Sequence, residues 1–118
     1  MIKHSFRINE GGLPGFAIEN KYWMLMDLHT RDIRIVKKII KDLESVINDE
    51  VEKAEIEGYD ITYVECSKNG CLIYCSGEDT MGPIPVQWFL DLFKDWLAFL
   101  VNFEEAKRND SNSSSSKP

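Results

Sequence analysis

The apolar run at residues 88–103 most constrains the fold, because twelve of its sixteen residues are apolar. A helix that buries a single stripe against a core uses only about half of its positions for apolar side chains. Pro85 can open this helix at its first position, and we expect the helix to cover residues 85–105. Apolar side chains outside that stripe therefore need cover from elsewhere in the chain or from a partner.

We expect Trp88, Phe93 and Trp96 to be anchored in the core. Further apolar residues fall on other faces of the same helix: Leu90, Leu97 and Val101. They can lie under a loop predicted at residues 77–82, or they can form an apolar surface for a partner or a second copy of the chain.

The remaining pattern predicts strands and one more helix. Alternating or β-rich residues indicate the strands, and turn residues separate them. The strand ranges are 2–8, 22–28, 60–67 and 71–76, the helix range is 31–57, and a short extended piece falls at 16–19. We therefore predict an α+β fold, an antiparallel sheet of about four strands with two helices packed on one face, in the order β-β-α-β-β-α.

Length and composition predict a single α+β domain over residues 1–106. Residues 107–118 contain five serines and no large apolar side chain. Such a segment cannot offset the entropy lost on ordering, so we expect a disordered Ser-rich tail.

The helix predicted at residues 31–57 is amphipathic, since its apolar residues are spaced three and four apart. Thr30 is a plausible N-cap, and Gly58 is a natural terminator. Asn48-Asp49 can mark a break, because neither residue favours a helix interior. We interpret the stretch as one continuous helix.

Lys68-Asn69-Gly70 predicts a hairpin turn between two β-rich runs. A two-residue Asn69-Gly70 turn would pair Lys68 with Cys71, whereas a three-residue loop would pair Ser67 with Cys71. The sequence leaves this register open.

Charge changes sign along the first helix. Residues 31–41 carry five bases and one acid, and residues 42–60 carry eight acids and one base. On a continuous helix this distribution opposes the macrodipole, so the acids call for another explanation. We interpret them as a candidate binding surface for a basic partner; the alternative is a solvated face that keeps the protein soluble. The acidic residues are Asp42, Glu44, Asp49, Glu50, Glu52, Glu55, Glu57 and Asp60.

The formal net charge of −6 argues against nucleic acid as the main ligand, because phosphate binding needs clustered Lys and Arg. No export signal precedes the first predicted strand. The apolar run at 88–103 is too short to cross a membrane and contains Asp91, Lys94 and Asp95. We expect a cytoplasmic protein with neither a membrane nor a nucleic-acid partner.

The three cysteines, Cys66, Cys71 and Cys75, leave one unpaired in any disulfide scheme, which favours free thiols. A zinc site built on them would need His4 or His29 as a further ligand. A Cys–His nucleophilic pair would need one of these rings beside a cysteine. Buried thiols and structural histidines are the simpler interpretation. We therefore expect no metal, no cofactor and no catalytic residue.

The acidic stretch at 42–60, the hairpin at 60–76 and the aromatic helix that begins Pro83-Ile84-Pro85-Val86-Gln87-Trp88 resemble the small acidic immunity proteins of bacterial contact-dependent inhibition and other polymorphic toxin systems. The resemblance covers residues 1–106 and lies in size, charge and α+β make-up. These proteins share no common motif, so no residue role transfers. The resemblance implies a cytosolic inhibitor that binds one cognate toxin, often a basic nuclease, and covers its active site.

Three hypotheses follow for function. The leading one is a non-catalytic binding protein that neutralises a basic protein partner through its acidic surface. The second is a secretion-type chaperone or dimeric adaptor that uses an apolar surface near residues 88–103. An enzyme is third, and its sign would be a polar cleft around His29 and Cys66.

Overall fold

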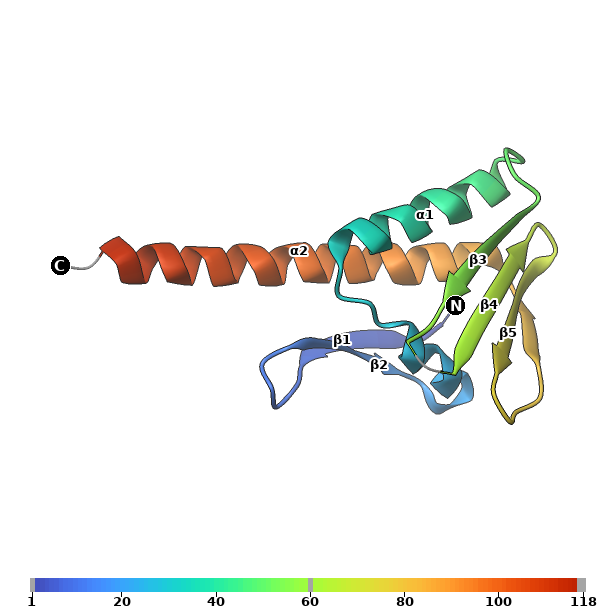
Figure 1. The fold of residues 1–118 in the computed structure, drawn as a ribbon, viewed down its shortest axis with the longest axis horizontal. Helices are drawn as coiled ribbons and strands as arrows, with labels where there is room; N and C mark the ends of the chain where they lie inside the picture. Colours follow the sequence, from blue (N-terminus) through green and yellow to red (C-terminus); the bar gives the residue numbers. More distant parts are fainter. Residues whose placement is uncertain (1, 60, 117–118) are drawn as a thin grey trace.

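The computed structural model describes residues 2–59 and 61–116, with side chains through Arg108 (Figure 1). It has an α+β fold, as predicted, but its element order is not the predicted one. The elements are β1 (His4–Ile8), β2 (Pro14–Ile18), the 3₁₀ helix η1 (Asn20–Leu28), α1 (Ile33–Ile47), β3 (Lys53–Glu57), β4 (Thr62–Ser67), β5 (Gly70–Cys75), β6 (Met81–Ile84) and α2 (Val86–Ser116).

The strands form two separate antiparallel sheets. β1 and β2 make a two-stranded hairpin, and β3, β4, β5 and β6 make a four-stranded sheet in chain order. The predicted sheet of four strands is therefore present, but with different members. β1 is not part of it, and β6 covers the end of the predicted loop and the residues just before the predicted last helix.

One core holds both long helices and one face of the four-stranded sheet. Burial alternates along β3 and β4, as expected for strands with one covered face. Phe89, Phe93 and Trp96 of α2 are completely buried, whereas Trp88 is half-buried. Leu90 is buried too, and Leu97 and Val101 are half-buried. Most of the apolar run at 88–103 is thus taken up by the protein's own core.

The β1–β2 hairpin covers a second side of α2. Phe6 of β1 packs against Trp96 and Phe99, with ring centroids 5.2 and 5.4 Å away. Phe16 of β2 meets Trp96 edge-on at 4.6 Å. The N-terminal hairpin therefore supplies the extra cover that the apolar run requires.

The prediction of a strand at residues 22–28 is wrong, because η1 occupies this segment. Tyr22, Met24, Leu25 and Leu28 are buried. Three of them, Tyr22, Leu25 and Leu28, are spaced three residues apart, which is the period of a 3₁₀ helix. Trp23 and Met26 lie between them and are exposed. The apolar composition had suggested a central strand, but the buried positions do not follow a strand's period.

The prediction of one continuous helix over residues 31–57 is also wrong. α1 begins after Asp32, whose side chain accepts a hydrogen bond from the Arg34 N–H at 2.9 Å, so Thr30 is not the cap. The helix stops at Ile47, and Asp49 follows in the left-handed region with φ 61°. Residues after Glu52 then alternate between exposed and buried as strand β3.

The end of α1 satisfies its last carbonyls through a local hydrogen-bond pattern. The Asp49 N–H donates to Val46 O at 3.2 Å, and the Glu50 N–H donates to Ser45 O at 2.9 Å. This is the Schellman arrangement, which requires a left-handed residue where Asp49 stands. The macrodipole argument therefore does not apply, because the acids from Asp49 onward are not on the helix.

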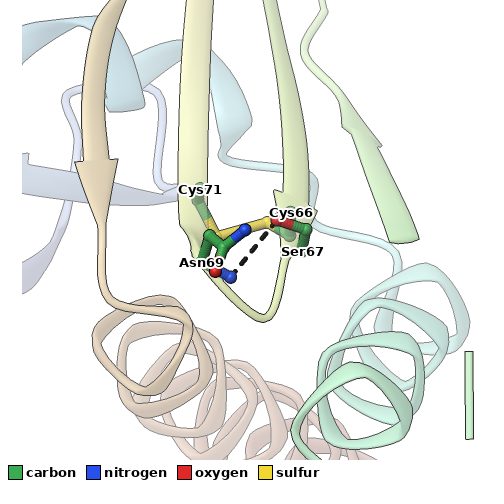
Figure 2. Close-up of a disulfide and its surroundings, with 4 residues drawn as sticks. All are labelled: Cys66, Ser67, Asn69 and Cys71. Atoms are coloured by element: carbon green, nitrogen blue, oxygen red, sulfur yellow. Dashed lines mark hydrogen bonds between the residues drawn. A yellow bond between two sulfur atoms is a disulfide. The ribbon is translucent and has the colours of Figure 1, made fainter. Parts of the chain in front are cut away.

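The β4–β5 hairpin follows neither of the two predicted registers. Lys68 and Asn69 form the turn, Ser67 pairs with Gly70, and Cys66 lies directly opposite Cys71. The Asn69 N–H donates to Ser67 Oγ at 3.3 Å and braces the turn (Figure 2). Gly70 has φ 122°, and a Cβ there would approach Pro83 Cβ to 2.8 Å, which explains glycine at this position.

This register corrects the prediction of free cysteines, because Cys66 and Cys71 form a disulfide (Figure 2). Their Cα atoms lie 4.1 Å apart, as expected for residues opposite each other in a non-hydrogen-bonded pair. Cys75 remains free and buried. The odd count was correctly taken to leave one free thiol, but it could not show that the other two meet.

Burial along α2 ends well before the helix does. Leu100 is its last buried residue, and the described side chains from Glu104 to Arg108 are exposed. The helix nevertheless continues to Ser116 and extends beyond the other elements, where we expected a disordered tail from Lys107 (Figure 1). The end of the folded unit near residue 106 stays a prediction.

Candidate functional site

A groove between α1 and β3 is the most distinctive surface of the described structure. It consists of two adjoining hollows of about 390 and 510 Å³. We call it the α1–β3 groove; both hollows are lined by Lys38, Asp42, Glu55 and Glu57. Ile35 and Tyr59 border one hollow, and Ser45 and Val51 border the other.

One wall of the groove is a flank of α1. Ile35, Lys38, Asp42 and Ser45 recur every three or four residues, so they form one row along the helix. The opposite flank carries Glu44, whose carboxylate lies 3.7 Å from Lys94 Nζ on α2. The helix thus divides its two acidic residues between the groove and the contact with α2.

The other wall is β3, which is an edge strand of the described sheet. Across the turn, the Gly58 N–H donates to Thr62 O at 2.7 Å, so Gly58 and Thr62 form a hydrogen-bonded pair. This pair determines which residues of β3 bond to β4. Hydrogen-bonded pairs alternate along antiparallel strands, so Ile56 and Ala54 bond to β4. The backbone groups of Lys53, Glu55 and Glu57 therefore point away from β4. Among the described residues they have no hydrogen-bond partner.

Asp27 holds the end of the groove in place. Its Oδ2 accepts hydrogen bonds from the Ile61 and Thr62 N–H groups at 3.1 and 3.0 Å. Its backbone oxygen accepts from the Tyr59 N–H at 3.1 Å. A Cβ on Gly58 would come within 2.8 Å of Thr62 O, so the close approach of this turn needs glycine. Tyr59 is thereby presented at the surface with 61% of its area exposed.

An exposed apolar patch adjoins this end of the groove. Trp23, Met26 and Ile61 surround a hollow of about 290 Å³ that also includes His29. The His29 ring lies 4.9 Å from the Tyr59 ring, so the patch and the groove meet at Tyr59. Exposed tryptophan and tyrosine are typical anchors of protein interfaces.

The charges along the groove are incompletely neutralised. Lys38 Nζ donates to Asp42 Oδ2 at 2.8 Å, and this hydrogen bond raises the pKa of Lys38. Lys53 lies 3.7 Å from Glu65. Within residues 2–59 and 61–116, Glu55 and Glu57 have no ion pair. Two exposed carboxylates are therefore available to a basic partner at this edge.

The outer face of the four-stranded sheet continues the acidic surface. Glu55 pairs with Glu65 across β3 and β4, and Tyr63 pairs with Tyr74 across β4 and β5. The two tyrosine rings lie 5.8 Å apart. A hydrogen bond to Glu55 and burial raise the pKa of Tyr63 to about 12, because both favour the neutral hydroxyl.

The structure brings only some of the predicted acidic residues together. Asp42, Glu55 and Glu57 line the groove. The two glutamates border it from the exposed face of β3, opposite the buried Ala54 and Ile56. Asp49, Glu50 and Glu52 instead line a separate hollow of about 330 Å³ beside the β4–β5 turn, where Asp49 forms an ion pair with Lys68. Glu44 faces α2, and Asp60 lies outside the described residues.

The residues considered for chemistry take up structural contacts. His4 Nε2 lies 2.8 Å from Asp95 Oδ2. His29 Nδ1 lies 2.5 Å from Met26 O. Cys66 is in the disulfide, and Cys75 Sγ accepts a hydrogen bond from the Thr62 hydroxyl at 3.9 Å. In the part of the chain that the structure describes, no three metal-ligating side chains are grouped to hold an ion.

No helix within the described residues is both long enough and apolar enough to cross a membrane. The apolar surface that an adaptor would have used on residues 88–103 is largely buried.

A comparison with protein-family models, curated proteins and solved structures finds no match for the chain. The assignment of a function therefore rests on the surface itself.

Sequence reasoning missed the groove, Tyr59 and the tyrosine pair Tyr63–Tyr74. Two features of the sequence could have predicted the groove. Asn48 and Asp49 tolerate the left-handed conformation that ends a helix, and polar and apolar residues alternate along Lys53–Glu57. Together these indicate a helix stop and an edge strand, which would have predicted a groove between them.

Proposed function

We propose that this protein is a non-catalytic binding protein that neutralises a basic protein partner, as an immunity protein neutralises its cognate bacterial toxin. The partner would dock along the α1–β3 groove and the acidic outer face of the sheet. Inhibition would follow from covering the active site of the partner, and the complex would form in the cytoplasm.

The observation that carries this proposal is the pair Glu55 and Glu57 on an edge strand: both are exposed, and neither forms an ion pair with a residue that the structure describes. Exposed carboxylates outside ion pairs speed the approach of a positively charged partner and suppress acidic competitors. Short-range binding would come from Tyr59 and Trp23, because partly exposed aromatic side chains lose little conformational entropy on docking. The carboxylates would therefore speed association with the partner, and the aromatic side chains would slow dissociation.

A growth assay tests the proposal. The protein encoded immediately upstream of this chain is expressed in bacteria alone, with the wild-type chain, or with the double variant Glu55→Gln/Glu57→Gln. We expect toxicity alone, rescue by the wild type and weakened rescue by the double variant. Binding of the two purified proteins is measured in parallel.

The matched control is Glu50→Gln/Glu52→Gln, which removes the same charge from the α1–β3 loop instead of the groove. We expect it to rescue growth almost as well as the wild type. A toxic upstream protein that the wild-type chain neither binds nor counteracts would refute the proposed function. Equal rescue by both double variants would show that the groove carboxylates are not part of the binding surface.

A further inference from the structure

The free edge of β3 offers a regular set of backbone groups. Hydrogen-bonded pairs alternate along β3 and β4, starting from the bond between Gly58 and Thr62. An N–H and a C=O therefore point away from β4 at each of Lys53, Glu55 and Glu57. Alternate residues along a strand are separated by about 6.6 Å, so these groups match the repeat of a second extended chain. No other strand of the described structure pairs with this edge.

The space beside this edge is open along the strand. The two hollows of the α1–β3 groove follow β3 from Tyr59 and Glu57 at one end to Lys53 and Val51 at the other. α1 forms a wall on the far side instead of closing over the strand. An extended segment can therefore lie between α1 and β3, where strand-addition complexes place a peptide.

We propose that β3 accepts an extended, basic segment of the partner protein as a fifth strand of the sheet. This inference rests on the proposed function, because it specifies how the same partner is held. Backbone hydrogen bonds to Lys53, Glu55 and Glu57 hold the segment in register. The segment's side chains then alternate between the groove and the outer face of the sheet.

The side chains around β3 define which segment fits. On the outer face, Lys or Arg at alternate positions lies opposite Glu55 and Glu57, forming cross-strand pairs of opposite charge. On the groove side, apolar residues meet Ile35 and Val51, which are 48% and 45% exposed. The expected signature is an alternation of basic and apolar residues over the five-residue length of β3.

A second copy of this chain is a less suitable occupant. Each copy carries a formal net charge of −6, and two of the three outward residues of β3 are acidic. Lys53, the third, already lies near Glu65. Like charges at an exposed edge discourage self-pairing while leaving the edge open to a basic strand.

The experiment uses synthetic peptides and the intact chain. The probe is acetyl-Lys-Val-Lys-Val-Lys-Val-Lys-amide. Its matched control has the same sequence with N-methylated backbone amides on the lysines, whose N–H groups would point to β3. Both carry the same charge, but only the probe can complete a ladder with β3. Amide hydrogen exchange of Lys53, Glu55 and Glu57 is followed by NMR. We expect the probe to slow exchange at Glu55 and Glu57 by about tenfold or more, and the control to leave it unchanged.

Two variants separate the backbone from the charge. Glu55→Pro removes both the carboxylate and the outward N–H, and proline is tolerated at an edge where its missing N–H faces solvent. Glu55→Gln removes the charge alone. We expect Glu55→Gln to weaken probe binding, and Glu55→Pro to weaken it further by about twofold to tenfold, because it also lacks a ladder hydrogen bond. Far-ultraviolet circular dichroism checks that both variants fold. The comparison of probe and control peptides on the wild-type chain does not depend on either variant.

The outcomes distinguish this inference from the proposed function. Equal, salt-dependent binding of probe and control would overturn strand addition while leaving an acidic docking surface in place. Binding of neither peptide would also overturn strand addition, and the growth assay then decides the function independently. A dimer in sedimentation experiments that Glu55→Pro dissociates would assign the edge to a second copy and overturn the proposal.

Discussion

At the residue scale, Trp96 joins three parts of the fold. Its side chain is completely buried on α2, and its Nε1–H donates to Thr30 O at 2.7 Å just before α1. Its ring also packs edge-on against Phe16 of the N-terminal hairpin. Losing it would leave a cavity where the hairpin, α1 and α2 meet.

We predict that Trp96→Ala lowers the free energy of unfolding by about 3–5 kcal/mol, the usual cost of such a cavity. The matched control is Trp23→Ala, which removes the same side chain from a position that is 47% exposed. The control should change stability by no more than about 0.5 kcal/mol. Urea unfolding measures both. A loss below about 1 kcal/mol at Trp96 would contradict its place in the core.

Tyr63 links the sheet surface to the charge on β3. Its pKa is raised from 10.0 to about 12, chiefly by the hydrogen bond to Glu55. A tyrosine that is harder to ionise when folded contributes stability below its unfolded pKa, near 10, and loses it as pH rises towards 12. The contribution is therefore complete at neutral pH and absent in strong alkali.

We predict that one of the four tyrosines ionises late when phenolate absorbance is followed against pH. Tyr63→Phe should remove this late step and so assign it. Glu55→Gln should shift the step towards lower pH, because the carboxylate that accepts the hydrogen bond is gone. Glu57→Gln removes an equal charge from the same strand and serves as the control. An unchanged step in Glu55→Gln would rule out Glu55 as the cause.

At the scale of elements, the junction between α1 and β3 creates the groove. The left-handed conformation of Asp49 ends the helix and lets the chain return alongside it as an edge strand. Non-glycine residues pay about 1–2 kcal/mol for this conformation, and aspartate is among the more tolerant. A residue that favours helical φ and ψ angles at position 49 would disfavour the turn from α1 into β3 that forms the groove.

We predict that Asp49→Gly is more stable than Asp49→Ala by about 1 kcal/mol, because glycine adopts a positive φ without steric cost. Both variants lose the ion pair with Lys68, so their difference isolates the backbone effect. Thermal and urea unfolding of the two variants provide the measurement. Equal stabilities would mean that Asp49 does not keep its left-handed conformation in solution.

The same junction shows how far the sequence could predict the elements. The helix face from Val36 to Val46, the strands around Lys68-Asn69 and the aromatic helix all follow strong local patterns, and all are present. Glu55 and Glu57 sit among residues compatible with a helix, so the pattern alone favoured continuing α1. Pairing with β4 overrode that preference. Met81 and Gly82 likewise fell in the loop predicted at residues 77–82, but the pairing of Met81 with Ile73 on β5 makes them part of β6.

The candidate site was harder to predict than the elements. Six of the eight acidic residues named from the sequence are exposed, whereas Asp42 is half-buried and Asp60 lies outside the described residues. Most of them were expected on one helix. Their division between the groove and the α1–β3 loop depends on the helix stop at Asp49. The free edge of β3 depends on which strands pair, and pairing between distant residues is not encoded in any local period. A run of charged residues therefore marks a segment of the chain without defining the surface that the segment forms.

At the scale of the whole molecule, a packed body carries a projecting helix end (Figure 1). The described side chains after Phe103 are exposed, so the core ends before the helix does. A helix that leaves its core depends on local propensity alone, which is marginal in water.

We predict that deleting residues 109–118 leaves the melting temperature unchanged. The described side chains from Glu104 to Arg108 are already exposed, so the core ends before the deleted segment, and the deletion should alter stability by no more than about 0.5 kcal/mol. Scanning calorimetry of the full and shortened chains tests this. The control deletion, of residues 97–118, removes Leu100 from the core and should unfold the protein. A loss of several degrees in the shorter deletion would place the boundary of the folded unit beyond residue 108.

The net charge of −6 and the position of the free carboxylates make separate contributions to binding. Overall charge attracts a basic partner from a distance, and salt screens this attraction with a Debye length of about 10 Å at 0.1 M and about 8 Å at 0.15 M. Carboxylates inside the contact act at close range and are screened less. The two contributions can therefore be separated by measuring association rates at several salt concentrations.

We predict that Glu55→Gln/Glu57→Gln and Glu50→Gln/Glu52→Gln slow association with the basic partner by similar factors at low salt, because both reduce the long-range field equally. As salt rises, the loop variant should approach the wild-type rate. The groove variant should remain slower and should also dissociate faster, since it loses contacts within the complex. Stopped-flow mixing gives the association rates, and surface-bound partner gives the dissociation rates. Two variants that stay indistinguishable at every salt concentration would mean that total charge, and not the α1–β3 groove, governs binding.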